Sequence, residues 1–123
     1  GNFDLAIQEF TAYLNNYPGG DKAAAALCNI GEAYRSQQKL PEAASAFTRV
    51  INDYPSTESV PSAIYKRATV RLAMQDRDGG VADLKAVVDR YPTTAEANQA
   101  KAELQKIGVK PAKPVKAAPR KSR

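Results

Sequence analysis

Apolar side chains recur at intervals of three and four residues along most of this chain. One such run lies between residues 22 and 37, and its apolar positions are Ala23, Leu27, Ile30 and Tyr34. A second run with the same spacing lies between residues 42 and 53. Because this spacing places the apolar residues on one face of an α-helix, the pattern predicts a succession of amphipathic helices.

The helical pattern repeats with a fixed period. The pair Tyr-Pro begins at residues 17, 54 and 91, so both intervals are 37 residues. Positions 10, 47 and 84 are always large and apolar, and positions 6, 43 and 80 are always small. A fixed period of this length is typical of stacked helical repeats, in which each repeat is a pair of helices.

Polar and proline residues predict the ends of these helices. Asp21 is expected to cap the helix that follows it, and Ser56-Thr57 is expected to cap the first helix of the next repeat. Pro41 suits the first turn of a helix, whereas Pro55 prevents continuation because it lacks an N–H group. The Tyr-Pro pair therefore marks the end of each second helix.

The last helix has the features of a terminal cap for the stack. Thr93 to Glu96 matches a capping box, and Gly108 is expected to end the helix in a left-handed conformation. Its outer face is predicted to be polar because nothing stacks beyond it. The residues expected to point outward are Lys101, Glu103 and Gln105.

The apolar and small positions resemble the tetratricopeptide repeat (TPR) pattern. The matching residues are Leu27, Ile30, Gly31, Tyr34, Ala43, Phe47 and Pro55. The resemblance implies an all-α, right-handed superhelical solenoid of antiparallel helix pairs with a C-terminal capping helix. We expect a half repeat at 1–20, repeats at 21–57 and 58–93, the capping helix at 94–108, and a tail at 109–123.

Within that superfamily, the chain resembles the C-terminal domain of the Tol-Pal system coordinator of the YbgF/CpoB type. It is similar, less closely, to the outer-membrane assembly lipoprotein BamD. The first resemblance implies a periplasmic adaptor in cell division that binds the TolA protein. The second implies a component of outer-membrane protein assembly. Both imply a non-catalytic protein-protein interaction module.

The composition favours binding over catalysis. The chain has no histidine and one cysteine, Cys28, which excludes disulfide pairing within the chain and the usual His-based or Cys-based catalytic and zinc sites. We therefore predict no enzyme activity and no cofactor or metal. Asp76, Asp78 and Gly79 look like the start of a calcium loop, but the twelfth position is Val87 instead of the required glutamate. That segment is interpreted as a turn, with Gly79-Gly80 supplying the tight bend.

The positive charge is concentrated at one end. The chain carries a formal net charge of +5, yet the residues after Gly108 contain lysine and arginine and no acid. This Pro-rich, Ala-rich segment is predicted to be a flexible tail, because it has too few large apolar residues to form a core. A polybasic arm for nucleic acid, anionic lipid or cell-wall polymer is the remote alternative. No apolar run is long enough to span a membrane.

The concave groove is the expected binding site. In a stack of helix pairs, the first helices line a concave surface that can hold a peptide. By periodicity from the buried positions, the groove residues are expected to be Asn29, Glu32, Arg35, Ser36, Tyr65, Lys66 and Thr69. Each of these alone could equally be a solvated surface residue.

Two departures from the repeat pattern affect this interpretation. Arg67 and Arg71 stand where the pattern has large apolar residues, and their charged heads are expected to lie in water over the edge of the core. The helix built on Phe3, Ile7 and Phe10 lacks a preceding partner. The chain is therefore expected to be a fragment of a longer protein, or to self-associate weakly through that face. A structural scaffold of end-to-end stacked chains is an alternative function.

Overall fold

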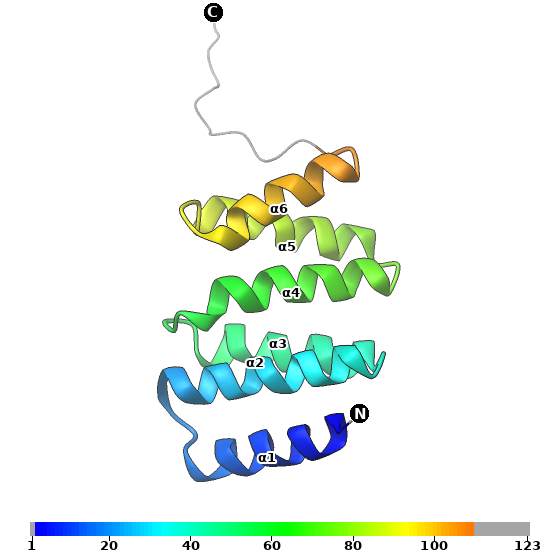
Figure 1. The fold of residues 1–123 in the computed structure, drawn as a ribbon. Helices are drawn as coiled ribbons and strands as arrows, with labels where there is room; N and C mark the ends of the chain where they lie inside the picture. Colours follow the sequence, from blue (N-terminus) through cyan, green and yellow to red (C-terminus); the bar gives the residue numbers. More distant parts are fainter. Residues whose placement is uncertain (1, 110–123) are drawn as a thin grey trace, which may run out of the picture.

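The computed structural model describes residues 2–109, which form six α-helices joined by short turns (Figure 1). No strand occurs among these residues. Consecutive helices run in opposite directions and pack against one another, which confirms the predicted all-α solenoid of TPR type. The helices are α1 (Phe3–Asn16), α2 (Gly20–Ser36), α3 (Leu40–Asp53), α4 (Ser59–Ala73), α5 (Arg77–Arg90) and α6 (Ala95–Lys106).

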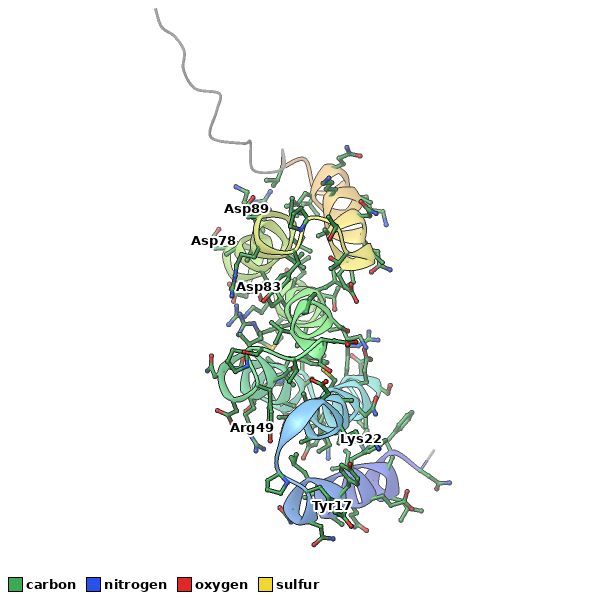
Figure 2. All side chains as sticks on the ribbon, turned by 90° about the vertical axis from the view of Figure 1, so that its left-hand side faces the viewer. Tyr17, Lys22, Arg49, Asp78, Asp83 and Asp89 are labelled. Atoms are coloured by element: carbon green, nitrogen blue, oxygen red, sulfur yellow. The ribbon has the colours of Figure 1, made fainter. Side chains whose placement is uncertain are left out.

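The stack has two layers of unequal spacing. In the layer of α2, α4 and α6, the helix α4 contacts both of its neighbours. In the layer of α1, α3 and α5, no Cα atom of one helix lies within 8 Å of the next. Figure 2, which looks nearly along the helices, shows α5, with Asp78, Asp83 and Asp89 labelled, on the same side of the stack as α3. The closely spaced layer is the inner side of a curved stack, so we call it the concave face.

The three Tyr-Pro pairs end their helices in the same conformation. Tyr17, Tyr54 and Tyr91 follow the last residues of α1, α3 and α5, with φ values of −135°, −131° and −133°. Each tyrosine N–H donates a hydrogen bond to the carbonyl four residues earlier. The ring packs against the core in the second and third copies, whereas Tyr17 is 61% exposed. This confirms the prediction that Tyr-Pro is the stop signal of each repeat.

Three predicted helix caps are wrong. Asp21 lies inside the first turn of α2, which begins at Gly20 without a side-chain cap. The residue before α4 is Glu58, again without a side-chain cap, and the Thr57 hydroxyl donates back to the Tyr54 carbonyl instead. The cap of α6 is Thr94, whose hydroxyl oxygen accepts from the Ala97 N–H at 3.1 Å. Helices α2 and α4 thus begin without a side-chain cap, and the cap of α6 lies one residue later than predicted.

The two turns between paired helices have one geometry. Gln38 and Gln75 hold the same position in successive repeats and both have positive φ, 62° and 68°. In both turns, the next residue donates its N–H to a carbonyl at the end of the preceding helix. The prediction that Gly79-Gly80 makes the bend is therefore wrong, because both glycines lie within α5 and Asp76 caps that helix through the Gly79 N–H at 3.0 Å.

Replacing Gln75 by glycine is expected to raise the free energy of unfolding by about 0.5 kcal/mol. A left-handed conformation costs a non-glycine residue roughly 1–2 kcal/mol, and the higher entropy of unfolded glycine offsets part of the gain. The same change at Gln99, an exposed site inside α6, is expected to lower stability by about 0.5 kcal/mol. Urea unfolding followed by circular dichroism measures the change in the free energy of unfolding for each variant. A decrease in stability at both sites would contradict the left-handed turn assigned to Gln75.

Glycine at two buried positions lets the helices approach closely. A Cβ atom at Gly31 would lie 2.6 Å from Cε1 of Phe47, whose side chain is fully buried between α2 and α3. A Cβ atom at Gly80 would lie 2.6 Å from Leu72. The expected close approach of paired helices at Gly80 is therefore confirmed, and Phe47 is the largest side chain in the buried core. Gly108 has a φ of 81°, which confirms the predicted left-handed end of the last helix.

Candidate functional site

Three of the predicted groove residues form a charged cluster on the concave face. The Glu32 carboxylate on α2 accepts from Lys66 of α4 at 2.8 Å. Its other oxygen accepts from Nη2 and Nε of Arg35 at 2.9 and 3.1 Å. The cluster joins the first helices of two successive repeats and carries one positive charge in excess. The Arg35 side chain is 47% exposed, so it is the most accessible member of the cluster.

The surroundings of Glu32 favour its ionised form. Partial burial alone would raise the pKa of this carboxyl, but the hydrogen bonds from Lys66 and Arg35 outweigh it and hold the pKa below its usual value. Beneath the cluster, burial raises the pKa of the Cys28 thiol, which is 7% exposed. Cys28 is therefore a packed apolar residue, and the ionic groups above it are the accessible chemistry of this face.

The aromatic member of the predicted groove lies nearer to α6. Burial raises the pKa of the Tyr65 hydroxyl, and the Glu103 carboxylate of α6 raises it further. Glu103 is only partly exposed and lies near enough to Tyr65 to affect its hydroxyl, so it does not simply point outward as expected. The periodicity did not identify Glu103 as a neighbour of Tyr65. The Glu103 carboxylate also accepts a hydrogen bond from the Lys106 ammonium group at 3.5 Å.

The remaining predicted groove residues take no part in the cluster. The Thr69 hydroxyl donates to the Lys66 carbonyl at 2.7 Å, so it is satisfied within its own helix. Asn29 lines a different hollow, between α1 and α2, and Ser36 is exposed at the end of α2. The structure thus brings together Glu32, Arg35 and Lys66, and it leaves Asn29 and Ser36 apart from them.

The expectation that Arg67 and Arg71 hold their heads in water is wrong. Nε and Nη2 of Arg67 donate to the two oxygens of Asp83 at 3.0 and 2.8 Å, and Nη1 donates to the Thr48 hydroxyl at 3.1 Å. Arg71 donates to the same carboxylate at 3.0 Å. Asp83 is only 4% exposed. This network, which we call the arginine bridge, spans the gap between α3 and α5.

The repeat register carried a signal for the arginine bridge. A step of 37 residues takes Ile30 to Arg67, Tyr34 to Arg71 and Ala46 to Asp83. Two apolar residues of one repeat are thus arginines in the next repeat. At a third position, alanine in the first of these repeats is aspartate in the second. Comparison of the two repeats position by position identifies the three charged residues as unusual, but only the structure shows that they meet. Hydrophobic periodicity alone could not identify these three residues, because it considers each position separately.

Two hollows lie beside α1. One, of about 480 Å³, lies between α1 and α3 on the convex side, and residues of α2 also line it. Figure 2 shows Arg49 of α3 directed toward this region. The other, of about 450 Å³, lies between α1 and α2 and is lined by Phe10, Tyr13 and small residues. Phe3, Leu5 and Tyr17 of the first repeat are also exposed, so α1 has an uncovered apolar side.

Neither a metal-binding group nor a membrane-spanning helix is found among the residues that the structure describes. Residues 2–109 contain no group of three or more histidine, cysteine or acidic residues able to hold a metal ion. No helix there has the length and apolar character to cross a bilayer. The predicted polybasic arm beyond Val109 lies outside the residues that the structure describes. The concave face presents ionic, aromatic and hydroxyl groups on its helices.

Comparison with known proteins agrees with this character. A family model described as YfiO, outer membrane lipoprotein, matches residues 1–110, which include all six helices. No curated protein matches the chain. The family match supports the likeness to the outer-membrane assembly lipoprotein, and it does not extend to the Tol-Pal coordinator.

Proposed function

Because this chain belongs to the YfiO family of outer membrane lipoproteins, we propose that it is a non-catalytic protein-binding module of the cell envelope. Its role is in outer-membrane protein assembly, and a periplasmic location follows from that role. The observation that carries the proposal is the cluster of Glu32, Arg35 and Lys66, which projects ionic groups from two repeats into one concave surface.

The chemistry of the surface defines the partner. Arg35 is half exposed and the cluster has an excess positive charge, so the partner segment supplies a carboxylate at that point. Tyr65, one repeat further along, provides a flat amphipathic surface for an apolar side chain. The partner is therefore an extended or helical segment with an acidic residue next to an apolar one. The alternative function, a Tol-Pal adaptor that contacts TolA in cell division, would bind its partner in the same groove.

The double change Arg35→Glu and Tyr65→Ala is expected to weaken partner binding by about tenfold or more, because central charged and aromatic residues dominate interface energies. Arg90→Glu, at an exposed position on α5 in the opposite layer, is the matched control and is expected to bind like the parent chain. Affinity capture from a Gram-negative envelope extract, followed by titration of the purified partner, measures the loss. The partner's identity separates outer-membrane assembly from the Tol-Pal system.

Self-association is the competing function, and it rests on the uncovered side of α1. Exposed Phe3, Leu5 and Tyr17 motivate this alternative. Light scattering at micromolar concentration tests it, with Leu5→Lys as the disrupting variant. A monomer at all concentrations would remove the scaffold function, whereas a dimer insensitive to the groove variants would weaken the binding-module proposal.

A further inference from the structure

The hollow between α1 and α3, which we call the convex pocket, has an internal counterpart in the same molecule. The counterpart lies one repeat later, between α3 and α5, and there the arginine bridge fills the space. In the convex pocket the equivalent of Arg67 is Ile30 and the equivalent of Asp83 is Ala46. These side chains are too short to cross the gap, and a space of about 480 Å³ results.

The floor and the rim of the convex pocket differ in polarity. Leu14, Leu27, Ile30 and Ala46 form the floor, and none of them carries a charge. The rim carries one acid, Glu42, and one base, Arg49, so its charges balance. In the counterpart the charges lie on the floor, where the arginine bridge is. The rim positions equivalent to Glu42 and Arg49 are the uncharged Gly79 and Ala86. The convex pocket therefore selects an uncharged, apolar insertion.

Small polar side chains flank the apolar floor on both walls. Thr11 and Asn15 lie one turn apart on α1, and Ser45 lies on α3. None of the three makes a side-chain hydrogen bond within residues 2–109. Such groups suit the N–H and C=O groups of a peptide main chain, which need partners when they are desolvated. An acyl chain has no such groups to offer.

We propose that the convex pocket is a second peptide-binding site, which receives bulky apolar side chains of an extended partner segment while Thr11, Asn15 and Ser45 bond its main chain. The site lies on the opposite layer from the concave face, so it can be occupied independently. A cationic side chain is not the expected insertion, since the floor has Ala46 where a cation would need an acid. A site of this volume lies within the range of roughly 300–1,000 Å³ that accommodates ligands.

The test fills the convex pocket with the ion pair that already fills the equivalent space one repeat later. We call the resulting protein the plugged variant. The double change Ile30→Arg and Ala46→Asp places the Arg67–Asp83 pair in the convex pocket, opposite Thr11 as the original pair is opposite Thr48. A dodecapeptide library displayed on phage is selected on the parent chain. The enriched sequences are expected to carry bulky apolar residues without a basic excess, and the synthesised peptides to bind the plugged variant about tenfold more weakly or worse.

Three controls keep the outcome interpretable. Thr11→Arg blocks the rim from an exposed position, which covers the case that the plugged variant fails to fold. The concave variant Arg35→Glu/Tyr65→Ala is expected to bind the same peptides with an affinity within about twofold of the parent chain. Failure of the proposed function of the concave face is therefore distinguishable from failure of the convex pocket. The triple change Arg67→Ile, Arg71→Tyr, Asp83→Ala should open a second copy of the site. Enrichment of basic peptides, peptide binding that ignores both blocking variants, or occupation by decanoate alone would overturn the proposal.

Discussion

Replacing Asp83 by alanine is expected to lower the free energy of unfolding by about 3 kcal/mol, near the lower end of the range for breaking a buried ion pair. The carboxylate accepts three hydrogen bonds from two arginines and is 4% exposed. Without it, the Arg67 head loses its counter-charge while its side chain remains only 15% exposed. Arg71 is more accessible and can turn into water, which keeps the loss from reaching the upper end.

Urea unfolding at neutral pH measures this loss, with two variants as references. Asp53→Ala removes an exposed ion pair, with Arg49 at 3.9 Å, and is expected to cost less than about 1 kcal/mol. The triple variant Arg67→Ile, Arg71→Tyr, Asp83→Ala is expected to recover most of the loss, because apolar replacement of a whole buried ionic network is often neutral. Equal costs for Asp83→Ala and Asp53→Ala would show that the arginine bridge behaves as a surface pair.

Replacing Phe47 by alanine is expected to lower the free energy of unfolding by about 4 kcal/mol, as is typical of a fully buried phenylalanine. The ring fits against Gly31, where no side chain competes for the space between α2 and α3. The loss combines the transfer free energy of the ring with the cost of the cavity that remains, because the surrounding helices relax only partly. The same unfolding measurement gives the value.

Phe10→Ala is the matched control for Phe47→Ala. Phe10 holds the same position one repeat earlier, but it is only partly buried because no helix covers that side of α1. Its loss is expected to be about 1–2 kcal/mol, in proportion to the smaller apolar area removed from water. Losses of equal size would mean that the uncovered side of α1 is occupied in solution, and a dependence on protein concentration would identify the second copy as the occupant.

The concave site was partly accessible to sequence reasoning. Helical periodicity placed Glu32, Arg35 and Lys66 on one surface, and the structure brings their charged groups within hydrogen-bond distance. The same periodicity could not show that Thr69 satisfies itself within its helix or that Asn29 faces α1. Whether a polar group on a helix is free or satisfied depends on distances between helices, which a one-dimensional pattern does not contain.

The sequence by itself determined the repeat, the helix pairs and their ends at Tyr-Pro. These features depend on local physics, because apolar spacing fixes the buried face of a helix and proline ends it whatever its surroundings. The repeat pattern also identified Gly31 as a small position and Phe47 as a large one, and the structure packs the two together. Such features need only the neighbouring residues or a residue one period away.

Only the tertiary structure decided how the gaps between the outer helices are filled. The gap between α3 and α5 contains charge that Asp83 neutralises, whereas the gap between α1 and α3 remains a pocket with an apolar floor. Residues at the same place in two repeats thus perform different tasks. The physical reason is that the cost of burying a charge depends on whether an opposite charge from another helix reaches it, and that distance is set by packing across the whole stack.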